Sequence, residues 1–380
     1  MNSDAKKTTL ILTICALIGI IFIIGNALGI VAVNQKVLEL GNTIYEFNPE
    51  KMEEILLNGN QAIYISKDGL RAFNKDGAEI WSNTLSFKEI ETRKSYPYFA
   101  VSEPNGNKIL VFSNKGKLYE LIFKNKIVNF SINTNGEVAV IQKVDGGHII
   151  SAYSQTGRDL GVNSGSFTSN GDYPMTAVVS PNGNYIIVGS LYLNGSEVQS
   201  IIGAISVHKP EEVVTSPMFY VKKEPDNLIY NIEFINEDIF ASIGDKFVTF
   251  YDINGQLLRQ FKLDNVLFKI IIDEMTSLGG YIPIVTSAMT THAKNKLVLL
   301  NNLKEYIVQL DFDAPINYVN ANASGVVIGA GSVFKGYNRI GKETFRFVSK
   351  QNINKVLTNN YMTIAVTDKS IVRLVSKGGI

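Results

Sequence analysis

Residues 126–161 read KIVNFSINTNGEVAVIQKVDGGHIISAYSQTGRDLG, and this stretch decides the fold. Apolar and polar side chains alternate over residues 128–132, which places one set on each face of a strand. The continuous apolar run at 138–141 is typical of a strand that is buried on both faces. Glycine-containing turns follow these segments, and they predict a third strand at 148–153 and the start of a fourth at 158–161. We therefore expect a four-stranded antiparallel sheet that must pack against neighbouring sheets.

The turn before the presumed outer strand recurs along the chain. Five such turns end in a glycine, namely Gly77, Gly116, Gly157, Gly255 and Gly341. The first intervals are about 40 residues and the later ones about twice that, so we expect two further units with altered turns near residues 208–210 and 301–303. A period of about 40 to 45 residues with four strands per unit is the signature of a β-propeller. Long stretches with helical periodicity are absent from the sequence, which excludes solenoids of helical pairs.

We predict an all-β fold, an eight-bladed β-propeller, with seven blades as the alternative if one unit is irregular. The complete units are expected at residues 53–85, 86–123, 127–163, 174–221, 228–262, 266–310 and 316–348. Residues 353–376 supply only three strands, and residues 43–47 are the natural source of the missing outer strand. Such a closure joins the two ends of the propeller domain, residues 43–380, by hydrogen bonds and removes a free sheet edge.

An uncharged apolar segment, residues 10–33, precedes the propeller and predicts a transmembrane helix. Its 24 residues can cross a hydrocarbon core of roughly 30 Å at about 1.5 Å per residue. Two lysines in the tail at 1–9 favour a cytoplasmic N-terminus and an extracytoplasmic propeller, with residues 34–42 as a linker. We therefore expect a single-pass protein of the cell membrane. The alternative is a cleaved signal peptide, because residues 27–29 offer the small side chains that a signal peptidase accepts.

Two further features lie within the predicted membrane helix. Gly25 and Gly29 form a G-x-x-x-G pair that would let two helices approach closely, and Asn26 could donate a hydrogen bond between them. The single cysteine, Cys15, lies in the same segment, so the external domain cannot form an internal disulfide. This fits a bacterial surface where folding does not depend on disulfides.

Composition and motifs argue against several classes of function. The net charge is only +1, and no basic patch is present, so we expect no nucleic-acid partner. The three histidines, His148, His208 and His292, lie in different units without metal-ligand spacing. Residues 336–343 resemble a phosphate-binding loop that is one residue short, and their flanks predict a hairpin. We therefore expect no metal, no cofactor and no enzymatic activity.

Two resemblances support this assignment. Residues 68–81, DGLRAFNKDGAEIW, resemble the outer half of a quinoprotein-type blade, in which a glycine turn precedes a short strand that ends in tryptophan. Trp81 is the only tryptophan, so the resemblance implies a blade and not a quinone site. The whole layout is similar to a family of uncharacterised membrane-anchored propeller proteins of low-GC Gram-positive bacteria. That resemblance implies the location and the fold, and it assigns no functional residue.

Propellers bind partners on the face built by the turns between second and third strands and by the connections between blades. The long predicted loops of this kind are residues 163–174, 191–199, 222–227 and 287–296. They carry aromatic and polar candidates for ligand binding, namely Asp172, Tyr173, Tyr192, Asp226 and His292. We expect a binding or scaffolding module for a protein or an envelope polysaccharide. The alternatives are a glycan hydrolase that uses Asp172 and Asp226, and a sensor that acts through an intramembrane partner.

Overall fold

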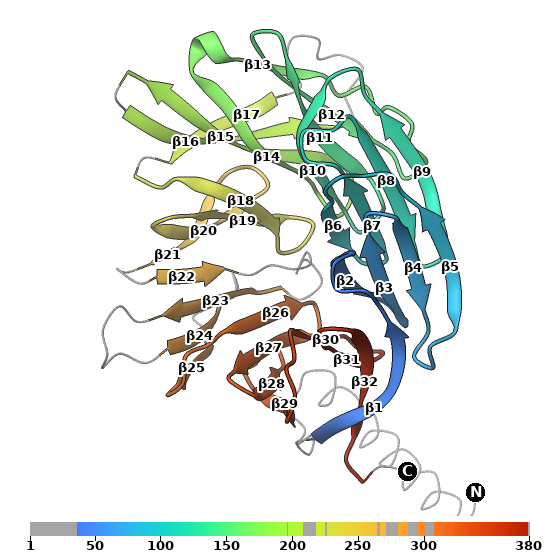
Figure 1. The fold of residues 1–380 in the computed structure, drawn as a ribbon. Coiled ribbons are helices and arrows are strands. Elements are labelled where there is room, and N and C mark those ends of the chain that lie inside the picture. Colours follow the sequence, from blue (N-terminus) through green and yellow to red (C-terminus); the bar gives the residue numbers. More distant parts are fainter. Residues whose placement is uncertain are drawn as a thin grey trace, which may run out of the picture.

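The chain is all-β in the computed structural model, which describes residues 36–195, 197–207, 218–224, 226–263, 267–270, 280–287, 295–300 and 308–378. Every described regular element is a strand except for the 3-10 turn η1 (Thr168–Asn170). The strands form six four-stranded sheets and one eight-stranded sheet, arranged around a common centre (Figure 1). The all-β class and the propeller-like arrangement that the sequence predicts are confirmed.

Consecutive strands pair antiparallel in each of the six four-stranded sheets, which we call sheets 1 to 6. Sheet 1 contains β2 (Met52–Asn58), β3 (Gln61–Ser66), β4 (Gly69–Phe73) and β5 (Glu79–Thr84). Sheet 2 contains β6 (Glu91–Ser95), β7 (Tyr98–Ser102), β8 (Lys108–Ser113) and β9 (Gly116–Ile122). Sheet 3 contains β10 (Lys126–Ile132), β11 (Val138–Val144), β12 (Gly147–Tyr153) and β13 (Ser164–Phe167).

The remaining sheets follow in chain order. Sheet 4 contains β14 (Asp172–Val179), β15 (Tyr185–Asn194), β16 (Glu197–Ser206) and β17 (Met218–Glu224). Sheet 5 contains β18 (Ile229–Phe234), β19 (Ile239–Gly244), β20 (Phe247–Asp252) and β21 (Leu257–Lys262). Sheet 6 contains β22 (Leu267–Ile270), β23 (Ile282–Ser287), β24 (Asn295–Leu300) and β25 (Val308–Phe312). The eight-stranded closing sheet contains β26 (Tyr318–Asn322), β27 (Gly325–Ala330), β28 (Val333–Tyr337), β29 (Glu343–Val348), β30 (Lys355–Thr358), β31 (Thr363–Val366), β32 (Ser370–Ser376) and β1 (Lys36–Glu46).

The predicted turns before the outer strands are present, and hydrogen bonds between residues of the same turn hold each of them in shape. The amide of Gly77 donates to the carbonyl of Asn74 at 3.1 Å, while the Asn74 side chain accepts from the amides of Asp76 and Ala78. Gly77 has a φ of 89°, and an added Cβ would lie 2.9 Å from the Ile44 carbonyl oxygen of β1. Only glycine fits here, because the left-handed backbone and the close approach both exclude a side chain.

The core lies between adjacent sheets, and β11 shows how the sequence produces it. Ala139 and Ile141 of this strand pack with residues of sheet 4, whereas Val138 and Val140 pack with residues of sheet 2. All four side chains are fully buried. A strand that is covered on both faces needs an uninterrupted apolar run, which is what residues 138–141 provide.

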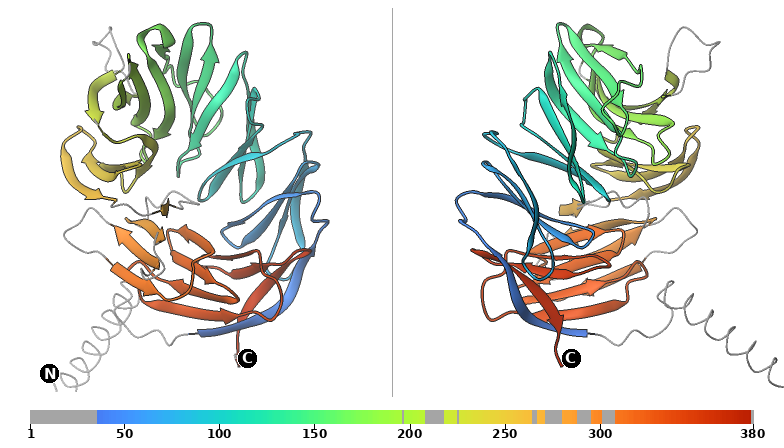
Figure 2. Two further views of the ribbon diagram at one scale, coloured as in Figure 1. Left: turned by 60° about the vertical axis from the view of Figure 1, so that its left-hand side comes forward. Right: turned by 90° about the vertical axis from the view of Figure 1, so that its right-hand side faces the viewer.

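The first and last described strands close the fold side by side (Figures 1 and 2). Strand β1 pairs antiparallel with β32, with Leu40 opposite Leu374 and Tyr45 opposite Ile371. Its beginning also pairs in parallel with β29, so that Lys36 lies opposite Phe345. The prediction that residues 43–47 supply the missing outer strand is therefore confirmed, and the strand is longer than predicted.

Three local predictions differ from the structure. Residues 36–42, which were predicted as part of a linker, belong to β1, because pairing with both β29 and β32 extends the strand toward its beginning. The fourth strand of sheet 3 does not start at 158–161; Tyr153 and Asp159 form only an isolated bridge, and β13 begins at Ser164. Much of the predicted loop 191–199 is a hairpin, in which Tyr192 of β15 lies opposite Gln199 of β16.

The predicted tail, membrane helix and signal-peptidase site, residues 1–33, lie outside the described residues. In the described part of the chain, no helix is long and apolar enough to cross a membrane.

Candidate binding site

Three of the five predicted ligand-binding residues come together on paired strands of sheet 4. Asp172 begins β14 and lies opposite Tyr192 of β15, and Tyr173 lies opposite Leu191. The ring of Tyr173 contacts that of His148 on β12 edge to face, with centroids 6.3 Å apart. The Lys223 ammonium lies 5.6 Å from the centroid of the Tyr192 ring. These three predicted residues therefore lie close together on strands and not on loops, and their role in binding stays a prediction.

This cluster contains three buried polar atoms without a hydrogen-bond partner among the described residues. They are Oδ1 of Asp172, Nδ1 of His148 and Oγ of Ser166. Burial raises the pKa of Asp172, against a hydrogen bond from Ser190 that lowers it, and burial lowers the pKa of His148. Ser166 lies opposite His148 in the ladder, yet its hydroxyl makes no hydrogen bond to the imidazole. The hydroxyl thus lacks the contact with a base that would activate it as a nucleophile.

Asp226 lies in the connection between β17 and β18, with a positive φ of 60°. Its side chain is 85% exposed, and it faces Lys246 with 4.0 Å between Oδ1 and Nζ. Asp172 is half-buried beside His148, so the two carboxylates of the glycosidase alternative have different environments and different partners. His292, Gly25, Asn26 and Gly29 lie outside the described residues.

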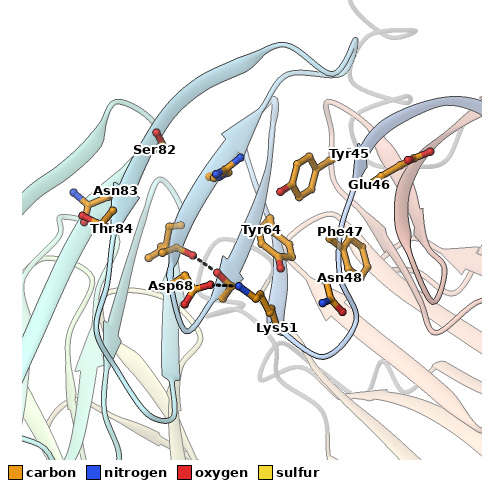
Figure 3. A pocket seen from close by; sticks show the side chains of 14 residues that line it. Tyr45, Glu46, Phe47, Asn48, Lys51, Tyr64, Asp68, Ser82, Asn83 and Thr84 are labelled. Carbon is orange, nitrogen blue, oxygen red and sulfur yellow. Dashed lines mark hydrogen bonds and ion pairs between the residues drawn. The ribbon is translucent and has the colours of Figure 1, made fainter.

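A groove with a volume of about 730 Å³, which we call the closure groove, lies where β1 meets sheet 1 (Figure 3). Its lining comes from three segments: residues 45–51 at the end of β1 and in the connection to β2, residues 64–71 around the β3–β4 turn, and residues 82–84 at the end of β5. These segments lie on the face formed by turns between second and third strands. The sequence predicted binding on this face, but on later units.

Aromatic rings form the inner wall of the closure groove. The ring of Tyr64 lies 5.1 Å from that of Tyr45 and 5.5 Å from that of Phe47. Tyr45 in turn stacks on Phe73, with 4.3 Å between centroids. Burial raises the pKa of Tyr64, so its phenol stays neutral and can both donate and accept a hydrogen bond. Tyr64 and Phe47 are only 5% and 8% exposed and belong to the core, so the half-buried Tyr45 is the ring of this wall that a partner can reach most readily.

Charged side chains of both signs surround this wall. The Lys51 ammonium donates to the Asp68 carboxylate at 2.8 Å, although both side chains are more than half exposed, and this bond raises the pKa of Lys51 (Figure 3). Arg71 is 53% exposed and lies 3.8 Å from Glu79. Exposed ion pairs of this kind contribute little to stability, so these groups can exchange their partners for those of a ligand.

Glycine fixes the β3–β4 turn that forms one side of the closure groove. An added Cβ on Gly69, where φ is 156°, would lie 2.4 Å from the Asn83 carbonyl oxygen of β5. The Asp68 carbonyl accepts from the amide of Leu85 at 3.1 Å and holds the turn against the end of β5. The closing strand was predicted from the sequence but the groove was not, because the groove exists only where these distant segments meet.

The described residues contain no group of three or more histidine, cysteine, aspartate or glutamate side chains that could hold a metal ion. The prediction of no metal is compatible with this observation and stays a prediction, since His208 and His292 lie outside the described part.

Residues 42–374 match a protein family that is described only as a family of unknown function, DUF5711. No curated protein matches the sequence. Among solved structures, BamB from Moraxella catarrhalis is similar to this chain with a TM-score of 0.51 and 12% identity, over 90% of this chain and 99% of that one. Citrobacter koseri AztD matches with a TM-score of 0.48 and 10% identity, over 85% and 96% of the two chains. Kluyveromyces lactis Hsv2 matches with a TM-score of 0.46 and 13% identity, over 82% and 98%. At such low identity the likeness to BamB bears on the fold alone.

Proposed function

The chain belongs to the DUF5711 family, and we propose that it is a membrane-anchored, extracytoplasmic β-propeller that binds a protein partner of the cell envelope without catalysing a reaction. The closure groove is the observation that carries this proposal. Its aromatic wall and its exposed charges of both signs are the groups that protein interfaces use for anchoring and for orientation. A polysaccharide would use the same aromatic surface but has no need of charges of both signs.

The number of blades in this proposal is eight. The closing sheet divides into β26-β27-β28-β29 and β1-β32-β31-β30; the ladder joins these halves through the parallel pairing of β1 with β29, and a shared core packs them together like neighbouring sheets. Each half is a four-stranded unit like sheets 1 to 6, and β1 completes the second half as its outer strand. Six sheets and two halves give eight units.

The membrane anchor of this proposal is the apolar segment 10–33. Only residues 34 and 35 separate it from β1, so the anchor would hold the closing sheet near the lipid surface. A short basic tail at 1–9 supports a cytoplasmic N-terminus. Fractionation of intact cells, followed by protease treatment from outside, tests this arrangement: the propeller should remain with the membrane and be accessible to the protease.

Site-specific photocrosslinking in intact cells tests the binding function. A photoreactive amino acid at Asn83 in the closure groove should give a discrete protein adduct, whereas the same amino acid at Lys115 should not. Lys115 is a matched control, because it is exposed in the β8–β9 turn at the opposite end of the strands. Arg71→Glu should weaken the adduct at Asn83 by reversing one charge of the groove. Equal adducts at both positions, or an adduct that survives the charge reversal unchanged, would contradict the proposal.

A further inference from the structure

A second groove, of about 620 Å³, lies at the beginning of β1, between the two halves of the closing sheet. We call it the anchor-side groove. Its lining includes Lys36 of β1, Arg373 and Ser376 of β32, Tyr361 of the β30–β31 turn and Ser324 of the β26–β27 turn. Turns between first and second strands lie on the face opposite to that of the closure groove, which is at the other end of β1. The two grooves therefore lie on opposite faces of the fold.

Basic side chains gather at this end of the closing sheet. Arg346 of β29 lies opposite Val37 of β1, and the amide of Lys377 donates to the Val37 carbonyl at 2.8 Å. Lys36, Arg346 and Lys377 are exposed, and none of them has an ion pair or a side-chain hydrogen bond with another described residue. The paired segments of β1, β29 and β32 at this end contain one acidic residue, Glu39. Three cations thus meet here without carboxylate partners of their own.

Two further cations beside the anchor-side groove have acidic partners. Arg373 lies 3.8 Å from the Asp76 carboxylate, and Lys335 lies 3.4 Å from that of Glu343. The Asp76 side chain is 66% exposed, so this ion pair contributes little to stability and a ligand in the groove can replace Asp76 as the partner of Arg373. The unpaired charges at this end of the sheet are therefore mostly positive, which favours an anionic partner.

Exposed apolar and aromatic side chains accompany these charges. Val37 and Val348 are each 51% exposed, and Tyr361 is 60% exposed in the lining of the groove. Tyrosine is favoured at the interface between lipid and water, where its ring contacts apolar groups while its hydroxyl stays hydrated. A soluble anion would not contact such apolar groups, whereas a membrane surface offers both phosphate groups and apolar chains.

The position of the membrane anchor favours the same partner. This step rests on the proposed function, in which residues 10–33 cross the membrane. Successive Cα atoms are about 3.8 Å apart, so Lys36 lies within about 11 Å of the last anchor residue. The headgroup layer on each side of a bilayer is roughly 5 to 7 Å thick, so Lys36 and the strands paired with it are held at the edge of this layer.

We propose that the anchor-side groove and the basic residues beside it bind the headgroups of anionic phospholipids. The phosphate of one lipid lies in the groove against Lys36 and Arg373, and Arg346 and Lys377 contact neighbouring headgroups. Lysine and arginine donate strong, charge-assisted hydrogen bonds to phosphate oxygens, and each basic side chain near an anionic bilayer adds to the attraction. When this face lies on the lipid, the closure groove is on the side away from it, where a protein partner can reach it.

Fluorescence of the full-length protein in lipid nanodiscs tests the inference. Cys15→Ser removes the only cysteine, and Asn360→Cys then places a single fluorescent label on the exposed β30–β31 turn. A lipid that carries a quencher on its headgroup reports how close the label is. Quenching should be about threefold or more stronger in equal parts of phosphatidylcholine and phosphatidylglycerol than in phosphatidylcholine alone. The same label at Thr84, in the closure groove, should be quenched weakly in both lipids.

Charge substitutions show whether the basic residues cause this response. Replacing Lys36, Arg346 and Lys377 together with glutamine should reduce the quenching in anionic nanodiscs to the level in neutral ones. The matched control replaces three exposed lysines of the opposite face with glutamine and should leave the quenching unchanged; these lysines are Lys67, Lys88 and Lys246.

Equal quenching of the label on the β30–β31 turn in the two lipid mixtures would overturn the proposal, as would an anionic response that survives the triple substitution. Saturable binding of inorganic phosphate without any response to anionic lipid would also overturn it, because the groove would then serve a soluble phosphate compound. Failure of the full chain to enter the nanodiscs would contradict the membrane anchor of the proposed function, and the lipid-binding proposal would fall with it. A protein that enters the nanodiscs but shows no lipid dependence would leave the proposed function intact.

Discussion

Replacing Glu233 with glutamine should make the stability of the fold less sensitive to pH. Burial raises the pKa of this carboxyl group from an ordinary 4.5 to about 8. In the unfolded chain the group loses its proton near its ordinary pKa, whereas in the folded protein it keeps the proton to a much higher pH. The folded state therefore binds more protons between about pH 4.5 and about pH 8, and the free energy of unfolding must fall as pH rises through this window.

The magnitude follows from the shift of the pKa. A change of one pKa unit corresponds to about 1.4 kcal/mol, so the shift of Glu233 amounts to roughly 5 kcal/mol across the whole window. Glutamine has nearly the same shape and no ionisation. We expect Glu233→Gln to match the wild type below about pH 4.5 and to exceed its stability by several kcal/mol above about pH 8.

Chemical unfolding at a series of pH values measures this difference. The single tryptophan is a suitable reporter, because Trp81 stacks against Phe112 at 5.8 Å and donates to Gln61 at 3.2 Å, and unfolding exposes it to water. Glu120→Gln is the matched control, since this exposed carboxylate has its pKa lowered by a hydrogen bond from Lys117 and should not change the slope above about pH 5. The reasoning is refuted if wild type and Glu233→Gln stay parallel from about pH 4.5 to pH 9.

Three further predictions concern the scaffold. Ile44→Ala in β1, at a site only 4% exposed, should lower the free energy of unfolding by about 2–5 kcal/mol in denaturant titrations, and a loss well below 1 kcal/mol would show that β1 does not close the core. Gly341→Ala should lower the melting temperature, because φ is 75° and the new Cβ would lie 2.1 Å from Val308; an unchanged melting temperature would contradict the described turn. Glu224→Ala should cost roughly 2–4 kcal/mol by removing the acceptor of three buried hydrogen bonds, and a neutral substitution would contradict the structural role of this carboxylate.

The sheets could be predicted from the sequence because the turns and strands of each sheet are specified by residues that are close together in the chain. The glycine turns carry their own hydrogen-bond acceptors, as Asn338 shows by accepting from the amides of Ile340 and Lys342. Apolar runs such as 138–141 then identify strands that neighbours cover on both faces. The order of the sheets follows the chain, so no distant pairing had to be guessed except the pairing of β1 with β32.

The sites were harder to predict, because they depend on contacts that sequence spacing does not report. Leu191 to Gln199 was expected to form a binding loop, but Tyr192 and Gln199 are partners in a long hairpin. Asp172 and Asp226 were predicted to act together only because both were expected on loops of the same face. In the structure Asp172 lies beside His148, whereas Asp226 faces Lys246. The closure groove joins residues 45–51 to the β3–β4 turn through a strand pairing that links the two ends of the fold.

The central cavity of about 360 Å³, which the first strands of sheets 2 to 5 line, did leave a signal in the sequence, and its meaning depends on the position of the strand. In β10 the polar residues Asn129 and Ser131 alternate with Phe130 and Ile132, and the apolar pair is buried in the core between sheets. In β18 the same period places Asn231 and Glu233 in the lining of the cavity, while Ile232 and Phe234 are buried. Alternation of this kind usually means a strand with one face in water. In the first strand of a blade the polar face turns to the centre of the molecule instead, so an ionisable side chain there occupies a site that several sheets enclose.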